Sequence, residues 1–168
     1  NMLCHLKAQG YNLQGLPATE AEFASQIKQR GMLFNSFAAG DAERFMKSGH
    51  PQLVSRKEYE AWCAKSLRKD KTAEVEKAFG AFPGDHNLLK TADGRLAFAR
   101  LQYGNVVLLP QPMAGEGKDE FKMVHGTDQC PPHSYIAPYL WIQHGFQADA
   151  LIHFGTHGSL EFTPRKQV

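Results

Sequence analysis

Several common signals are missing from this 168-residue chain, and each absence narrows the possible classes of protein. No apolar run approaches the roughly 18 residues of a membrane-spanning helix, and no charged-then-apolar signal peptide opens the chain. Cys4, Cys63 and Cys130 are an odd number without CxxC spacing, which fits a reducing cytoplasm better than a disulfide framework. The formal net charge of +2 gives no electrostatic reason to expect nucleic acid or a membrane surface as a partner.

Nucleotide-binding motifs are also absent. Gly115 to Lys118 reads GEGK, but a phosphate-binding loop needs a glycine five positions before Gly117, and none stands there. Asp119 occupies the place of the Ser or Thr that would bind magnesium. Any dependence on ATP must therefore come from a partner protein.

The chain does have the composition of a globular protein, with 42% hydrophobic and 21% charged residues. Its first half predicts helices, because Thr19-x-x-Glu22 and Ser55-x-x-Glu58 are capping boxes followed by apolar residues at helical spacing. Two regions are expected, a mainly helical one over 1–82 and an α/β one over 83–168. The predicted helices of the first region are Met2 to Gln9, one after Thr19, Asp41 to Lys47, one after Ser55 and one capped by Thr72.

The second region predicts strands as well as a helix. Alternating apolar residues from Arg95 to Tyr103, the turn Gly104-Asn105 and the apolar run Val106 to Leu109 predict a β-hairpin. Farther on, Ser134 is expected to cap a helix that stops at Gly145. The fold class predicted is α/β, a helical first half followed by a hairpin and a parallel-type strand–loop–helix layer, as part of a larger multidomain protein.

The strand of that layer is expected at Asp149 to Phe154, an apolar run typical of a strand buried on both faces and central in its sheet. The loop Gly155-Thr156-His157-Gly158 follows at its carboxyl end, where open α/β sheets keep their sites. If Ser159 starts a helix, His157 and Glu161 face one direction, because they are four residues apart. The histidines are concentrated in this part of the chain, and five of the eight lie after residue 124: His125, His133, His144, His153 and His157.

The string HFGTHGSLEF, followed by TP and KQV, resembles the signature of the large subunits of cobaltochelatase and magnesium chelatase. The resemblance extends back through Pro131-Pro132-His133-Ser134-Tyr135 and weakens before residue 80. It departs from the family at Arg165, where the family has glycine, and at Pro138, where an aromatic residue is usual. Family members are many times longer, so the resemblance implies a fragment.

The resemblance implies a ligase that forms nitrogen–metal bonds, holding a tetrapyrrole while a divalent metal is inserted. Cobalt in a corrin precursor of cobalamin biosynthesis is favoured over magnesium, and ATP is hydrolysed by AAA+ and accessory partner subunits. The chain alone is expected to be inactive. The site implied has catalytic residues Glu161 and His157, tetrapyrrole contacts at Gly155, Thr156, Gly158, Lys166 and His133, and metal ligands His157, Glu161, His153 and His125.

These residue types suit the chemistry. A carboxylate beside the ring can accept pyrrole protons and transiently bind the metal. Imidazole is a good ligand for cobalt-like ions, whereas magnesium prefers oxygen. Three alternatives stay open. They are a magnesium chelatase-type subunit, a non-catalytic or degenerate tetrapyrrole- or metal-binding module, and a small metallohydrolase using His153, His157 and Glu161, although HExxH is missing. Structural roles for His144 and His153 also stay open.

Overall fold

The computed structural model describes residues 2–30, 40–112 and 130–155. Contacts divide the chain into a first unit, Asn1–Gln52 with Ala99–Pro110, and a second unit, Leu53–Phe98 with Gln111–Val168. This division is discontinuous in sequence, so the compositional boundary at residue 82 stays a prediction. Among the described residues, no helix is both long and apolar enough to cross a membrane.

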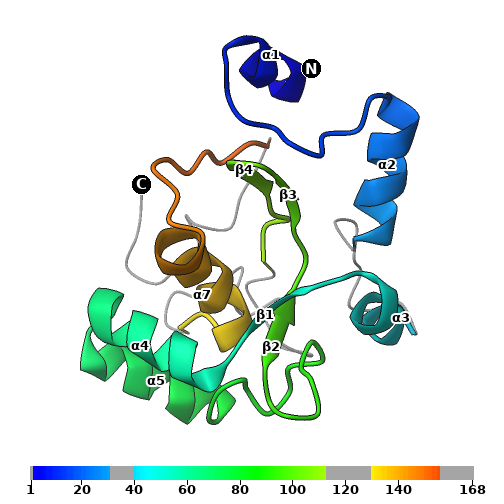
Figure 1. Ribbon diagram of the computed structural model, residues 1–168. Helices are drawn as coiled ribbons and strands as arrows, with labels where there is room; N and C mark the ends of the chain where they lie inside the picture. The colour runs from blue at the N-terminus through cyan, green and yellow to red at the C-terminus, as the bar shows by residue number, and fades with distance from the viewer. Residues whose placement is uncertain (1, 31–39, 113–129, 156–168) are drawn as a thin grey trace. The chain divides into compact units, whose positions relative to one another are not determined.

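Helices and short strands confirm the mixed α/β class (Figure 1). The helices are α1 (Met2–Ala8), α2 (Glu20–Gln29), α3 (Asp41–Ser48), α4 (Arg56–Ser66), α5 (Lys69–Phe79) and α7 (His133–Leu140), the last running into a π-helical turn, η2 (Trp141–Gly145). The strands are β1 (Gln52–Val54), β2 (Leu96–Phe98), β3 (Leu101–Tyr103) and β4 (Val106–Leu108). β1 pairs with β2, and β3 pairs with β4.

The first unit is built around the predicted hairpin. β3 and β4 are antiparallel, with Tyr103 opposite Val106 across the Gly104-Asn105 turn. The capping box of α2 is confirmed, because the Thr19 hydroxyl accepts from the Glu22 N–H and the Glu22 carboxylate accepts from the Thr19 N–H. The core of the unit is a cluster of apolar side chains: Leu3, Leu13, Leu101 and Tyr103, with Leu6, Leu16, Phe23, Ile27, Val106 and Leu108 against them.

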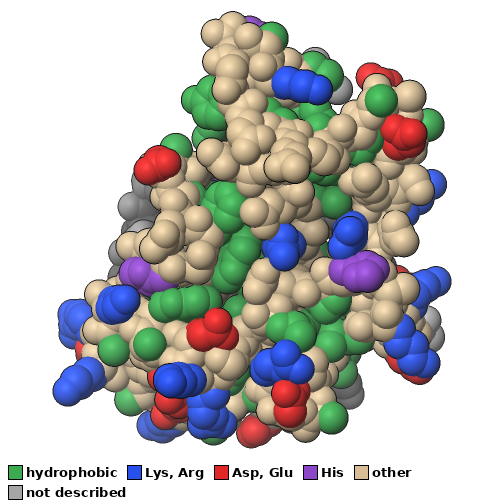
Figure 2. Space-filling model, in the orientation of Figure 1, with side chains coloured by type: hydrophobic (Ala, Val, Ile, Leu, Met, Phe, Trp, Pro, Cys, Tyr) green, Lys and Arg blue, Asp and Glu red, His purple; other side chains and the backbone are tan. Residues whose placement is uncertain are grey.

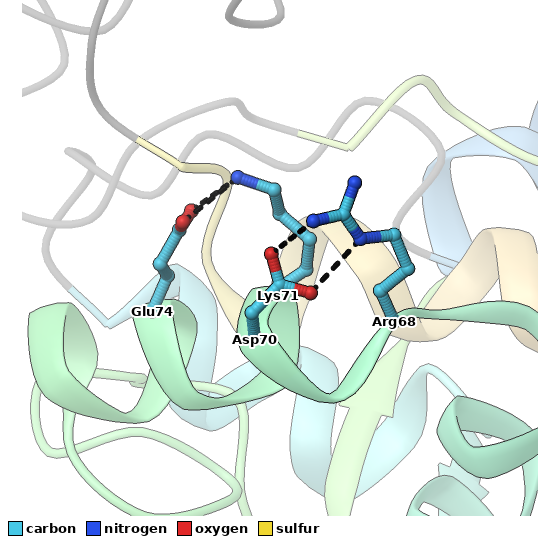
Figure 3. A network of polar contacts seen from close by, with 4 residues as sticks. All are labelled: Arg68, Asp70, Lys71 and Glu74. Carbon is cyan, nitrogen blue, oxygen red and sulfur yellow. Dashed lines mark hydrogen bonds and ion pairs between the residues drawn. The ribbon is translucent and has the colours of Figure 1, made fainter.

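In the second unit, the capping box at Ser55 is confirmed at the start of α4, but the predicted start of the next helix at Thr72 is wrong. α5 begins at Lys69 because the Arg68 carbonyl already accepts from the N–H groups of Lys71 and Thr72, at 3.0 and 3.2 Å. Figure 3 shows two ion pairs over this first turn, Arg68 with Asp70 and Lys71 with Glu74. Both are largely exposed, and exposed pairs contribute little to stability.

The predicted cap of α7 at Ser134 is also wrong, because the helix begins earlier. The Pro132 carbonyl accepts from the N–H groups of Tyr135 and Ile136, at 3.0 and 3.1 Å, so Pro132 is the capping residue. Pro132 has a φ of −71°, close to the value that its ring imposes and compatible with a helix entry. α7 contacts α4 and β2, and its residue Pro138 is buried within it.

The end of this helical segment at Gly145 is confirmed, although its geometry was not predicted. The Phe146 N–H donates to the Trp141 carbonyl over 2.7 Å, which closes a π-helical turn. A Cβ on Gly145 would lie 2.5 Å from Cδ1 of the Trp141 ring, so only glycine lets the indole lie against the backbone. Trp141 also stacks on Phe146 at 5.6 Å and meets the Phe98 ring edge-on.

The predicted buried strand at 149–154 is wrong. The backbone there forms no strand, and the side chains of Leu151, Ile152 and Phe154 are 51%, 70% and 82% exposed. Gln147, just upstream, has a φ of 59°, which turns the chain after η2. A strand needs hydrogen bonds from a neighbouring backbone, and among the described residues no strand pairs with this run. The parallel-type layer is therefore not observed.

Candidate functional site

Three of the predicted site residues lie in the described part of the chain: His133, His153 and Gly155. The other predicted site residues lie outside the described residues, and their roles stay predictions: His125, Thr156, His157, Gly158, Glu161 and Lys166. The described residues therefore cover the segment that precedes the glycine loop in sequence, namely α7, η2 and the run that leads to Gly155.

His133 is the first residue of α7 and is only 1% exposed. Its Nε2 lies 3.0 Å from the Gly80 carbonyl oxygen, and its Nδ1 lies 3.0 Å from the Tyr59 hydroxyl. A carbonyl can only accept a hydrogen bond, so Nε2 carries the proton and Nδ1 accepts from Tyr59. The imidazole thus ties the start of α7 to α4 and to the residue after α5.

Aromatic rings enclose this histidine. Tyr59 stacks on Phe82 with ring centroids 4.6 Å apart. The His133 ring meets both edge-on, at 5.3 Å from Tyr59 and 5.8 Å from Phe82. Such aromatic pairs contribute about 0.5–1.5 kcal/mol each beyond the area that they bury. The imidazole is therefore held by two aromatic rings as well as at both nitrogens.

The same burial keeps the network neutral. Burial lowers the pKa of His133, and the hydrogen bond to Gly80 only partly offsets this. Burial raises the pKa of the Tyr59 phenol, and the neighbouring Cys63 raises it further. The Cys63 thiol also has a raised pKa, mainly because it is buried. A neutral imidazole with both nitrogens engaged favours a structural role, and its predicted tetrapyrrole contact stays a prediction.

His153 has the opposite environment. It is exposed, in the apolar run that precedes the glycine loop. Its ring lies 6.1 Å from that of Tyr139, with 31° between the planes, and Tyr139 in turn lies 5.4 Å from Tyr135. Burial raises the pKa of Tyr139, and Tyr135 adds to the effect. The accessible imidazole is compatible with the predicted metal ligand, which stays a prediction.

Two contacts near this segment were not predicted from the sequence. The Ser66 hydroxyl lies 2.6 Å from Nε2 of His144, which ties the end of α4 to η2. The row of ring contacts from Tyr135 through Tyr139 to His153 was not predicted either. Tyr135 and Tyr139 are four residues apart on one helix, and this spacing could have indicated their contact. The Ser66–His144 contact joins residues far apart in sequence, so no local signal could have found it.

No group of three or more His, Cys, Asp or Glu side chains is placed to hold a metal ion within residues 2–30, 40–112 and 130–155. The predicted ligand set consists largely of residues beyond these ranges, with His153 as its described member. The described part of the chain contains a buried neutral network, in which His133 of α7 is hydrogen-bonded to Tyr59 and Gly80, and an exposed apolar run that precedes the glycine loop in sequence.

Comparison with known proteins defines the class of protein first. The CobN/Magnesium Chelatase family matches residues 1–168. The chain therefore belongs to this family, which confirms the resemblance seen in the sequence.

Individual relatives span both branches of the family. The aerobic cobaltochelatase subunit CobN of Pseudomonas aeruginosa is 33% identical over 168 residues, which are 100% of this chain and 13% of that protein. The chloroplastic magnesium-chelatase subunit ChlH of Oryza sativa subsp. indica is 35% identical over 169 residues, which are 100% of this chain and 11% of that protein. These identities do not separate cobalt from magnesium.

A solved structure agrees with both. The catalytic subunit of cobaltochelatase from Mycobacterium tuberculosis matches with a TM-score of 0.68 and 31% sequence identity, covering 95% of this chain and 13% of that one. The chain thus spans about an eighth of the length of its relatives.

Proposed function

We propose that this chain is a segment of the large, tetrapyrrole-binding subunit of an ATP-dependent metal chelatase. The observation that carries the proposal is the family match over residues 1–168, together with relatives of 33% and 35% identity whose names are chelatase subunits. His157 in the glycine loop, with His153 before it and Glu161 after it, supplies the residue types that metal insertion needs. Cobalt and a corrin precursor are the proposed substrates, because Ser159-Leu160-Glu161-Phe162 and Lys166-Gln167 resemble the cobalt branch of the family more closely than the magnesium branch.

In the proposed chemistry, Glu161 accepts protons from the pyrrole nitrogens as the metal replaces them. His157, with Glu161 and supporting donors from His125 and His153, binds the metal while it loses water. Backbone N–H groups at Gly155, Thr156 and Gly158 suit carboxylates at the edge of the ring, and Lys166 is a further cationic partner.

ATP hydrolysis is assigned to partner subunits, as the resemblance to the chelatase large subunits implies, and these 168 residues carry no phosphate-binding loop. AAA+ ATPase and accessory chelatase subunits are the proposed partners. The free cysteines Cys4, Cys63 and Cys130 support a reducing compartment such as the cytoplasm.

The test replaces Glu161 with Gln in the full-length protein that carries this segment. Glutamine keeps the size and hydrogen bonding of the side chain but removes its charge and basicity. Loss of a positioned acid–base group lowers insertion turnover by about 10²–10⁴-fold, whereas ring affinity, spread over many contacts, changes by less than about tenfold. Turnover is measured with the partner ATPases present, and ring binding by fluorescence quenching.

The matched control is Glu60→Gln, an exposed carboxylate on α4 that lies 3.7 Å from Arg56. It removes the same charge from a residue outside the family signature, so turnover should stay at the wild-type level. Near-normal turnover in Glu161→Gln, or a loss explained by loss of ring binding, would contradict the assigned role of Glu161.

A non-catalytic binding module is the second candidate, and the departure at Arg165 from the family's glycine favours it. An arginine would strain a turn that requires positive φ. The full-length protein would then change the absorbance of a tetrapyrrole on titration but insert no metal when supplied with partner ATPases.

A further inference from the structure

Tyr139 and His153 come together from two parts of the second unit. Tyr139 lies in the last turn of α7, and His153 lies in the run between η2 and the glycine loop. Their ring centroids are 6.1 Å apart, with 31° between the planes. This separation falls within the range of about 4.5–7 Å in which aromatic rings attract each other. The contact therefore links the run to α7.

α7 is a firm support for this contact. The network around His133 ties its first residue to α4 and to the Gly80 carbonyl. Ala137 and Leu140 are buried, so the helix is packed along its length. Packed interiors leave side chains and backbone little room to shift. The backbone of Tyr139 is thus fixed by the contacts of α7 with α4 and β2.

The Tyr139 ring is itself held on α7. Its centroid lies 5.4 Å from that of Tyr135, one turn earlier on the same side of the helix. Tyr135 is buried, so this neighbouring ring is fixed as well. Burial raises the pKa of Tyr139, and hydrogen bonds that its hydroxyl makes with Tyr135 and Gln111 act on the pKa in opposite directions. A ring held by a second ring and at its hydroxyl has little freedom to follow His153.

The run around His153 carries little else that could orient the imidazole. From 150 to 155 it has no Lys, Arg, Asp or Glu, whereas charged side chains gather over α4 and α5 on the face shown in Figure 2. The large apolar side chains of the run are mainly exposed: Leu151, Ile152 and Phe154. Among the described residues, the Tyr139 ring is therefore the contact that can orient His153.

We propose that Tyr139 is a positioning residue for His153, and that its ring holds the imidazole in one orientation before the substrate metal arrives. The inference rests on the proposed chelatase function, in which His153 is a supporting donor to the metal. The lone pair of an imidazole nitrogen lies in the ring plane, whereas two rings 31° from parallel interact mainly through their π systems. The imidazole can therefore be oriented and still bind a metal, and an oriented ligand loses less freedom on binding.

Titration of the full-length protein with cobalt(II) alone, without a tetrapyrrole, tests the positioning role. Binding is followed by the visible absorbance of the metal. Tyr139→Leu removes the ring and should raise the cobalt Kd by about three- to tenfold, which is within the range that the energy of one aromatic pair allows. Tyr139→Phe keeps the ring and should change the Kd by less than about twofold.

The effect must also depend on His153. In a His153→Ala background, which itself weakens cobalt binding, Tyr139→Leu should cause no further loss. A role of Tyr139 in packing alone would instead lower the affinity equally in both backgrounds. Phe146→Leu is the matched control, because Phe146 is another half-buried aromatic residue of the second unit and lies against Trp141. Its cobalt Kd should equal that of the wild type.

Circular dichroism and thermal melting check that each variant is folded. If Tyr139→Leu is not, Tyr139→Gln takes its place with the same expected loss, since glutamine keeps a polar group for Tyr135 and Gln111 but removes the ring. The inference is overturned if the wild type does not bind cobalt saturably or if removal of the ring leaves the Kd unchanged. It is also overturned if the loss is the same without His153, or if Phe146→Leu weakens binding equally.

The proposed function is tested separately, by the insertion turnover of the wild type with the partner ATPases present. Turnover in the wild type together with an unchanged cobalt Kd in Tyr139→Leu would overturn the positioning role alone. Absence of turnover in the wild type would overturn the proposed function.

Discussion

α7 and the run from Ala150 to Gly155 are near neighbours in sequence, and both carry the family resemblance, yet their side chains meet opposite surroundings. His133 on α7 is 1% exposed, and both of its ring nitrogens are hydrogen-bonded. In the run, Phe154 is 82% exposed and His153 touches a single described ring, that of Tyr139. The two histidines therefore differ in what they can do, although the sequence marks both as candidate site residues.

The difference arises from where each element finds its hydrogen bonds. A helix satisfies its backbone internally, so α7 needs only packing partners, which α4 and β2 provide. A strand depends on another backbone at its side, and the run from 149 to 154 has none among the described residues. An apolar run thus shows which residues could form a strand. It does not show whether a second strand lies beside them to share the backbone hydrogen bonds.

The largest expected effect comes from His133→Ala. The change leaves the Tyr59 hydroxyl and the Gly80 carbonyl without their partner and opens a cavity, so we expect a loss of about 3–4 kcal/mol in the free energy of unfolding. Urea denaturation measures it. The exposed His153 is the comparison, and His153→Ala should change the free energy of unfolding by less than about 0.5 kcal/mol. Equal losses at both positions would contradict the difference between a buried and an exposed histidine.

Gly145→Ala should destabilise the protein by about 1–3 kcal/mol, because the new methyl group would press on the Trp141 ring and small-to-large changes in packed sites cost that much. A double-mutant cycle with Trp141→Leu isolates the contact, since the smaller side chain makes room for the methyl group. If Gly145→Ala costs the same in both backgrounds, the indole is not the reason for glycine at this position.

The pH dependence of stability should reflect the buried imidazole. The pKa of His133 is lowered in the folded protein, so below about pH 6.5 the unfolded chain binds a proton that the folded chain excludes. Stability should therefore fall as the pH drops from 7, by up to about 1.4 kcal/mol per pH unit, and level off below the folded pKa. Urea midpoints measured between pH 7 and 5 for wild type and His133→Gln should converge, whereas parallel curves would contradict a depressed pKa.

Ser66→Ala should have a smaller effect than His133→Ala or Gly145→Ala. It removes the hydroxyl that lies 2.6 Å from His144, a contact between α4 and η2 at the protein surface. We expect a loss of about 0.5–1 kcal/mol, in the range of a single hydrogen bond. The control is Ser48→Ala on α3, an exposed serine whose hydroxyl donates to the Arg44 carbonyl of its own helix, and it should change stability less. A Ser66→Ala variant as stable as the wild type would show that the α4–η2 contact contributes nothing.

Local signals were predictable from the sequence, and long-range ones were not. The capping boxes at Thr19 and Ser55 and the hairpin turn at Gly104 involve residues within a few positions of each other, and all three are confirmed. The caps of α5 and α7 were misplaced because backbone carbonyls, at Arg68 and Pro132, take the role that Thr72 and Ser134 side chains were expected to fill.

The candidate site divides in the same way. The family match was predictable because the signature consists of unusual strings in a fixed order. The environment of His133 was not, because its partners Tyr59 and Gly80 lie 74 and 53 residues away in the chain. A histidine after two prolines has the same sequence appearance whether it is enclosed by aromatic rings or faces a ligand.

We propose that the buried network around His133 supports the site, while the chemistry belongs to the signature that begins at His153. Metal-insertion turnover of Tyr59→Phe in the full-length protein, with the partner ATPases present, tests this most directly, because the change frees Nδ1 of His133 and keeps the aromatic packing. If His133 only supports the site, turnover per folded subunit should stay within about threefold of wild type. Loss of an acid–base group would instead lower it by about 10²–10⁴-fold. A loss of that larger size, with the protein still folded, would place His133 in the chemistry and contradict the account.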